Sequence, residues 1–379
     1  MGGRRVMLAS LGPAWLILAA AAEPRLEVAP WEPDGPVLLA GGGSDSSLSV
    51  PVEPGGQYPP TRREAALAPA VAAVPDRRPA RPRRRTDVRL SVDMSVTADS
   101  NASNGTRLES VPIDFGEGPL PVPVDPNLRK RSDVGYGTSA AANVRLPIAS
   151  EAALAVDVEG YAIEYDGGRN DDASLLLAAG LELGAGAAPD GALQLIAFER
   201  WYGGVKALEG VGLRGNWRYP IDPRRNLRLA VDARIFHSGY GDSFGGREAS
   251  VYLSFDTVLN PRLSASAGLY AHRQWLRDDA FSSFDSGVFG GLSAFLGEDF
   301  SGGVSAGLSR IAFDEPFLRL DPEARSDWRV YGSAWLTTRR PLALGLHPSL
   351  TYTYNRSSSS IAYYDSDRHR LRLGVKRKF

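Results

Sequence analysis

Residues 370–379 read RLRLGVKRKF, and this stretch decides the fold. Leu371, Leu373 and Val375 alternate with charged or small neighbours, so an extended strand here has an apolar face and a charged face. The strand ends at an aromatic residue, Phe379. Such a strand fits the wall of a barrel in the outer membrane of a Gram-negative bacterium, where one face meets lipid and the other a watery lumen. We expect these four residues to be the signal that the barrel-assembly machinery recognises.

The same alternation recurs from Asp87 onward, between segments that carry turn residues. It predicts an all-β domain over residues 86–379, a transmembrane outer-membrane β-barrel of fourteen antiparallel strands. An even number is expected when every neighbouring pair of strands is antiparallel. The predicted strands are 87–98, 132–146, 152–165, 173–186, 192–202, 205–219, 226–237, 247–258, 263–274, 283–296, 300–313, 325–338, 346–356 and 363–379.

The connections between these strands alternate in length. Those after even-numbered strands are mostly short, such as Gly297–Asp299, and those after odd-numbered strands are mostly longer, such as Asp99–Arg131. Because outer-membrane barrels have short periplasmic turns and longer external loops, both chain termini are predicted to be periplasmic. The connection at Tyr202–Val205 departs from this pattern, since a tight hairpin stands where a long loop is expected.

Charged residues occupy one face of several predicted strands. In 226–237, Leu227 and Leu229 point one way and Arg228 points the other. A charge on the lipid face costs about 2–4 kcal/mol at the bilayer midplane, so these charged rows are predicted to line the lumen. Their signs are interleaved, which fits either a lattice of cross-strand ion pairs or separately solvated charges. The predicted lumen-lining residues, which are candidate transport residues, are Arg214, Arg218, Arg228, Asp232, Arg234, Glu248, Asp256, Asp327 and Arg329.

The first 22 residues have the composition of a secretory signal peptide. Arg4 and Arg5 precede an apolar run, Leu8–Ala22, that ends in small residues. The run is short and is interrupted by Gly12 and Pro13. A membrane-spanning helix needs about 20 apolar residues, so we predict a cleaved signal peptide over residues 1–22 rather than an anchor.

Residues 23–85 are rich in proline and poor in aromatic residues. A segment of this composition buries too little apolar surface to order itself, so it predicts a disordered periplasmic leader. A cluster of arginines near its end has two interpretations. It could tether the segment to anionic lipid or to a partner, or it could be a solvated charge run, and the solvated charge run is favoured. The cluster consists of Arg77, Arg78, Arg81, Arg83, Arg84 and Arg85.

Several function classes are disfavoured by composition. The chain has no cysteine, which excludes disulfides, thiol catalysis and thiolate metal sites. Its four histidines are scattered without ligand spacing, and no G-x-S-x-G elbow occurs, so we expect no enzyme, cofactor or metal centre. The net charge of −1 provides no field that would attract nucleic acid. Asp166–Asp172 could bind Ca²⁺ or bridge to lipopolysaccharide, although a solvated loop is favoured.

A set of short motifs in a fixed order resembles the barrel domain of the surface lipoprotein assembly modifiers, the Slam proteins. No single motif is specific, and their order and spacing over residues 87–379 carry the resemblance. The motifs are Asp99-Ser100-Asn101, Arg200-Trp201-Tyr202, Arg325-x-Asp327, Pro348-x-Leu350-x-Tyr352-x-Tyr354-x-Arg356, the serines Ser357–Ser360, Ile361, Tyr363-Tyr364 and the terminal Phe379.

The resemblance implies a fourteen-stranded barrel that helps deliver lipoproteins across the outer membrane to the cell surface. It implies lipoprotein clients and no nucleotide, metal or hydrolysis; outer-membrane lipid and lipopolysaccharide are expected to surround the barrel. Members of the family commonly carry tetratricopeptide repeats before the barrel. Residues 23–85 show no period of about 34 residues, so three alternatives are open: client capture differs here, another protein performs it, or the basic leader is used.

Two other functions remain open on the sequence. A polar-lined barrel would act as a porin-like passive channel for small solutes, unless the proline-rich connection 99–131 folds inward as a plug. An exporter of polysaccharide would need aromatic platforms along the lumen. The residues that could supply them are Tyr252, Tyr270, Tyr331 and Trp335.

Overall fold

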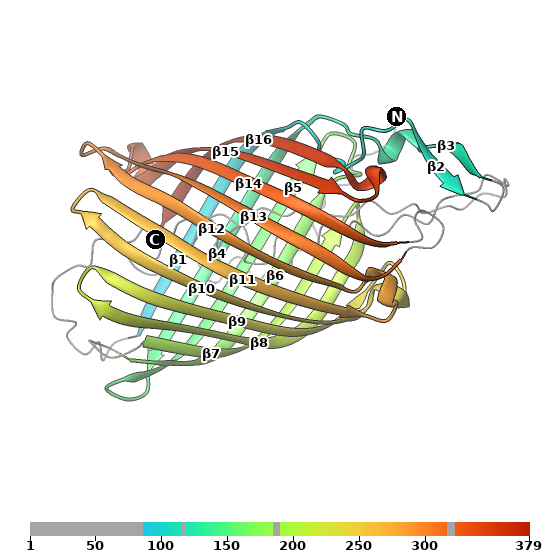
Figure 1. The fold of residues 1–379 in the computed structure, drawn as a ribbon. Coiled ribbons are helices and arrows are strands. Elements are labelled where there is room, and N and C mark those ends of the chain that lie inside the picture. Colours follow the sequence, from blue (N-terminus) through green and yellow to red (C-terminus); the bar gives the residue numbers. More distant parts are fainter. Residues whose placement is uncertain (1–85, 115–117, 185–189, 317–322) are drawn as a thin grey trace.

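The computed structural model of the chain describes residues 86–114, 118–184, 190–316 and 323–379. The predicted signal peptide, 1–22, and the predicted leader, 23–85, lie outside the described residues. Fourteen antiparallel strands form a closed barrel, in which β1 pairs with both β4 and β16 (Figure 1). The barrel strands are β1 (Asp87–Asp99), β4 (Asp133–Pro147), β5 (Ala152–Tyr165), β6 (Asp172–Leu183), β7 (Asp190–Tyr202), β8 (Val205–Asp222), β9 (Arg225–Ser238), β10 (Gly246–Asn260), β11 (Leu263–Leu276), β12 (Ser283–Leu296), β13 (Phe300–Pro316), β14 (Ala324–Thr338), β15 (Leu346–Ser359) and β16 (Ser366–Lys378).

The predicted fold class, an all-β barrel of fourteen antiparallel strands, is confirmed. We call the end at which β1 finishes the loop end, and the opposite one the turn end. The loop end carries the long β1–β4 connection, which contains a two-stranded hairpin of β2 (Ser110–Asp114) and β3 (Pro119–Pro123). Figure 1 shows this hairpin projecting beyond the barrel.

Short 3-10 turns complete the connections. At the loop end they are η3 (Pro126–Leu128), η4 (Asp242–Phe244), η5 (Asp279–Phe281) and η7 (Ala362–Tyr364), and at the turn end η6 (Ala343–Gly345). Within the described ranges, no helix is long and apolar enough to span a bilayer.

The tight hairpin between β7 and β8 is present as predicted. Gly203 and Gly204 have φ of 57° and 82°, the left-handed region that both central residues of a type I′ turn require. Because glycine lacks a Cβ, it adopts this conformation without strain. The two strands can therefore be joined by two residues, whereas the other connections at the loop end are longer.

Alternate residues of each strand differ in exposure, so the barrel has two chemically distinct faces. On β1, Met94 and Val96 are exposed on the outer face, whereas Asp93, Thr97 and Asp99 are buried on the inner face. The other strands repeat this arrangement: exposed leucines and valines cover the outside, and serines, arginines and aspartates fill the inside. An apolar exterior and a polar interior are what a barrel in lipid requires.

Candidate functional site: the barrel interior and its loop-end collar

Most of the predicted lumen-lining residues form ion pairs on the inner face. Arg214 of β8 lies directly opposite Asp232 of β9, and its Nε donates to that carboxylate at 3.1 Å. Arg228 pairs with Asp256 of β10. These contacts form a lattice of cross-strand ion pairs, one of the two arrangements that the interleaved charges left open.

The second part of this lattice contains a histidine that the strand pattern did not single out. Arg234 lies 3.4 Å from Glu248, and the other carboxylate oxygen of Glu248 lies 3.3 Å from Nε2 of His272. The His272 side chain is 1% exposed and stands in register with Asp285 of β12. Tyr270 donates a hydrogen bond to Asp285 at 3.1 Å. Polar contacts inside the barrel therefore link β9, β10 and β11 through Glu248, and a separate hydrogen bond links β11 to β12.

The remaining predicted residues lie at the two ends of the barrel. Asp327 is fully buried near the loop end and accepts two hydrogen bonds from Arg325, at 3.0 and 2.7 Å. Arg329 follows on the same face of β14 and is half-buried. Arg218 lies near the turn end, where its exposed side chain pairs with Asp190. The structure thus brings the nine residues onto one face but does not gather them into one cluster.

An aromatic patch interrupts the polar lining. Tyr252 and Tyr270 stack with ring centres 5.5 Å apart, and Phe289 and Tyr331 complete the cluster. A Cβ at Gly287 would come within 2.8 Å of the Tyr270 ring, so glycine is needed for that ring to lie against the wall. Three of the four residues considered as aromatic platforms therefore meet here, while Trp335 is not among the buried members of this cluster.

Several buried polar atoms in the described part of the interior have no hydrogen-bond partner. They include both amide atoms of Gln274 and the hydroxyls of Ser293, Ser305 and Thr353. Buried polar groups in proteins are usually bonded, so these atoms are exceptions within the described interior.

The junction of β1 and β16 is fastened at its loop end by a buried ion pair. Arg368 of β16 donates to Asp99 at 2.9 and 3.0 Å, and the Tyr165 hydroxyl donates to the same carboxylate at 3.1 Å. The Ser100 amide donates to the His369 carbonyl at 2.9 Å, and the His369 amide donates to the Ser100 hydroxyl oxygen at 2.8 Å. Sequence inspection found the charged face of β16 but not this partner.

Asn101 extends the same fastening into the β1–β4 connection. Its side chain is fully buried; the amide donates to the carbonyl of Gly105 at 3.1 Å and to that of Asp367 at 3.3 Å. The neighbouring Ala102 packs on Ile163 and Tyr165. The start of this connection is therefore held against the barrel mouth, while the β2–β3 hairpin projects away from it (Figure 1).

Two further buried ion pairs stand at the loop end. Arg200 binds Asp172 through two hydrogen bonds, of 2.9 and 2.6 Å, with both side chains 3% exposed. Arg325, the partner of Asp327, lies 3.5 Å from the ring centre of Tyr364, a cation–π contact. We call the three pairs Asp99–Arg368, Asp172–Arg200 and Arg325–Asp327 the collar.

The tyrosine beside the collar joins it to the projecting hairpin. Tyr363 packs against the apolar cluster of Val111, Val124 and Leu128 at the hairpin base. Burial raises the pKa of Tyr363 to about 12, and the nearby charge of Asp125 acts in the same direction. Hairpin and η7 thus form one packed unit outside the barrel wall.

The sequence model of the surface lipoprotein assembly modifiers matches residues 89–379, which is the whole barrel apart from its first two strand residues. The chain belongs to this family. Membership assigns the chain a role in surface lipoprotein assembly, an outer-membrane location and lipoprotein clients, and is consistent with a role that involves no catalysis. Several of the residues that carried the resemblance share a location, since Asp99, Asn101, Arg200, Arg325 and Tyr364 all belong to the collar or touch it.

Known barrels of solved structure are similar in shape only. A bacterial polysaccharide outer membrane secretin matches with a TM-score of 0.42 and 12% identity, over 76% of this chain and 98% of the other. The channel DcaP of Acinetobacter baumannii matches with a TM-score of 0.41 and 11% identity, over 78% and 97%. Likenesses this distant say nothing about function. No curated protein matches the chain.

Proposed function

We propose that this surface lipoprotein assembly modifier is a translocation factor that passes lipoprotein clients through its interior to the cell surface. The loop end faces outward in this proposal, and both termini are periplasmic. Family membership joined to a closed barrel with a polar interior carries the proposal. The connection lengths support the orientation, because the short turns lie at the end from which β1 starts.

The pairing of charges suits an interior that must accept many sequences. Paired arginines and carboxylates, such as Arg214 with Asp232, leave little net field, so a client segment of either sign meets no strong repulsion. The nine predicted lumen-lining residues act in this proposal as the wall along which the client moves.

The collar keeps the resting barrel closed at its outer end. Asn101 and Ala102 are buried in the mouth, so a client leaving through the loop end has to displace the start of the β1–β4 connection. The porin-like alternative gains no support from this arrangement, because His272, Gln274 and Asp327 are almost completely buried rather than exposed along an open pore.

The direct test is surface display of a client. The barrel is produced in a Gram-negative host together with a tagged form of the lipoprotein encoded nearest to it, and protease is added to intact cells. We expect the lipoprotein to be cleaved only when the barrel is present. A lipoprotein that stays protected, with a purified barrel that conducts small ions in a planar bilayer, would replace translocation by passive permeation.

Assembly of the barrel is tested separately. We propose that Leu371, Leu373, Val375 and Phe379 are read by the barrel-assembly machinery and that residues 1–22 direct export. Deletion of Phe379 is expected to lower the folded band in a heat-modifiability gel of outer membranes. Normal folded levels after deletion would remove the assembly role of this residue.

A further inference from the structure

Among the described strand residues, the arginines that face outward near the loop end stand on one side of the barrel, on β10, β11, β13 and β15. Along β13 the outward residues Val304, Ala306 and Leu308 are apolar, and the next outward residue toward the loop end is Arg310. On β10 the outward row that includes Val251 ends at Arg247, and on β15 the row that starts with Leu350 reaches Arg356. Each apolar row thus ends on its loop side at an exposed arginine.

Strand register places Arg310 and Arg356 at one height in the membrane. Arg310 is in register with Trp328 of β14, which is in register with Ser358 of β15. Arg356 lies two residues closer to the turn end than Ser358. From β13 to β15 the position therefore shifts by one residue per strand toward the turn end. Barrel strands tilt by roughly 35–45°, and this stagger keeps residues on alternate strands level with the bilayer. Arg273 of β11 follows the same rule. Through Phe284 of β12 it is in register with Ala312 of β13, which lies two residues closer to the loop end than Arg310.

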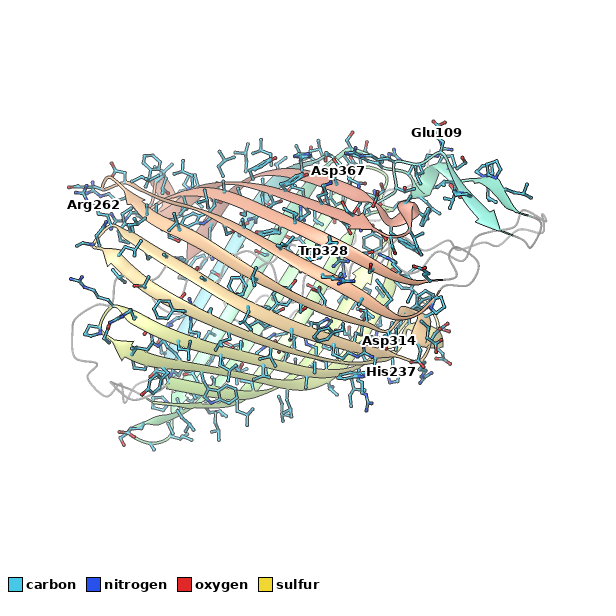
Figure 2. All side chains as sticks on the ribbon, in the orientation of Figure 1. Glu109, His237, Arg262, Asp314, Trp328 and Asp367 are labelled. Atoms are coloured by element: carbon cyan, nitrogen blue, oxygen red, sulfur yellow. The ribbon has the colours of Figure 1, made fainter. Side chains whose placement is uncertain are left out.

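Tryptophans stand between these cations. Arg247 and Arg273 lie over the Trp275 ring at 5.3 and 5.5 Å, and Arg310 lies 5.8 Å from the centre of Trp328. Figure 2 shows Trp328 on the near wall of the barrel, between Arg262 at the turn end and Asp314 at the loop end. Tryptophan is the side chain that marks the membrane–water interface, so the arginines lie at the depth of lipid headgroups.

Three of the four cations have no carboxylate partner in the described part of the chain. Arg273 is bound by Asp314. Among the described residues, by contrast, Arg247, Arg310 and Arg356 form no ion pair. Arg356 stands opposite Asp367, but that carboxylate is bound by Arg107 and Lys130. The rim of β5 to β8 has a net negative charge: Glu164, Glu199 and Glu209 face outward there, and one lysine, Lys206, pairs with both Glu199 and Glu209.

We infer that Arg247, Arg310 and Arg356, with Trp275 and Trp328, form a binding surface for the phosphate groups of lipopolysaccharide in the outer leaflet. We call these five residues the basic rim. Guanidinium groups bind phosphate through paired hydrogen bonds, and an indole beside them packs on the lipid below. The glutamates on the rim of β5 to β8 do not bind phosphate, so the barrel holds lipopolysaccharide on the wall that carries the basic rim. The inference shares with the proposed function only the orientation of the loop end.

The test compares two triple variants of the full-length barrel. The rim variant carries Arg247→Gln, Arg310→Gln and Arg356→Gln; the control carries Arg224→Gln, Arg262→Gln and Arg340→Gln, three exposed arginines at the turn end. Both are purified from outer membranes after heat-modifiability confirms folding. Lipopolysaccharide retained per barrel is then measured, as is binding to vesicles that contain lipopolysaccharide, its dephosphorylated form, or phosphatidylglycerol.

The rim variant is expected to bind lipopolysaccharide vesicles about fivefold more weakly per arginine removed, the effect of about 1 kcal/mol for each basic residue at an anionic surface. The control should bind like the wild type. A rim variant with lysine in place of glutamine should bind between the two, because lysine keeps the charge but cannot form the paired hydrogen bonds. Equal retention by both triple variants, or an equal loss of phosphatidylglycerol binding, would overturn the assignment. A failure of client display alone would not overturn the lipopolysaccharide assignment, because the vesicle-binding assay contains no client.

Discussion

The two ends of the barrel use the same ion-pair chemistry in different surroundings. At the loop end, Asp99 and Arg368 are 0% and 6% exposed, and the other collar pairs are equally enclosed. At the turn end, Arg218 and Asp190 are 53% and 29% exposed, and the pairs formed by Arg340 are more exposed still. The difference indicates that the collar pairs are shielded from water, whereas the charges of these turn-end pairs remain hydrated. In the proposed function, the collar is therefore the barrier that a client meets at the exit.

Removing the carboxylate of one ion pair at each end should give the largest difference in stability between the two ends. Asp99→Asn leaves the Arg368 cation buried without its counter-charge, and removal of one partner of a buried pair costs about 3–5 kcal/mol. We expect a clear loss of folded barrel and a lower urea midpoint of unfolding. Both are measured from the heat-modifiable band on gels.

Asp190→Asn is the matched change at the turn end. Its pair with Arg218 is exposed, and exposed pairs contribute about 0–1 kcal/mol, so the urea midpoint should hardly move. A double variant that exchanges the charges, Asp99→Arg with Arg368→Asp, tests whether the pair itself matters. If Asp99→Asn and Asp190→Asn were equally mild, the collar would not be the closed end.

The collar also marks the limit of what sequence could predict. The direction of Leu371, Arg372 and Leu373 follows from local alternation alone, because side chains of a strand point to opposite faces in turn. The pairing of Arg368 with Asp99 does not, since the two residues are 269 positions apart and meet only through barrel closure and register. For the same reason the charged rows were predictable, whereas the contact between Glu248 and His272 was not.

Local composition also concealed some structure. The β2–β3 hairpin was not predicted, because Pro119, Pro121 and Pro123 argue against a strand. An isolated two-stranded hairpin tolerates them, since each strand has a free edge that needs no amide donors. The burial of His272 and Gln274 was hidden for a different reason: a strand pattern shows which way a side chain points, but not what covers it.

Charge reversal along the interior should have a smaller effect on folding but a large one on transport. Arg228→Glu with Arg234→Glu turns two ion pairs, with Asp256 and Glu248, into like-charge contacts on the client's path. We expect surface display of the lipoprotein to fall severalfold more than the folded yield. Display is measured by protease shaving and yield by heat modifiability, on the same cells.

The turn end again provides the control for this reversal. Arg224→Glu with Arg262→Glu adds the same negative charge where side chains are exposed to water, so display should stay near the wild-type level. An equal loss of display and folding in the interior variant would mean that Arg228 and Arg234 are structural. An equal effect of both variants would show that net charge, rather than the interior wall, controls transport.

The smallest expected effect is local to the loop end and depends on pH. Undocked Tyr363 would titrate near its ordinary pKa of 10, whereas packing against the hairpin raises the pKa to about 12. Between these values the undocked state releases a proton that the docked state retains, so docking weakens as pH rises from 10 toward 12. A fluorophore on Leu120→Cys, the only thiol in the chain, should gain mobility over this range. Tyr363→Phe should abolish the dependence, while Tyr219→Phe at the turn end should not; a transition that survives Tyr363→Phe would assign it to another group.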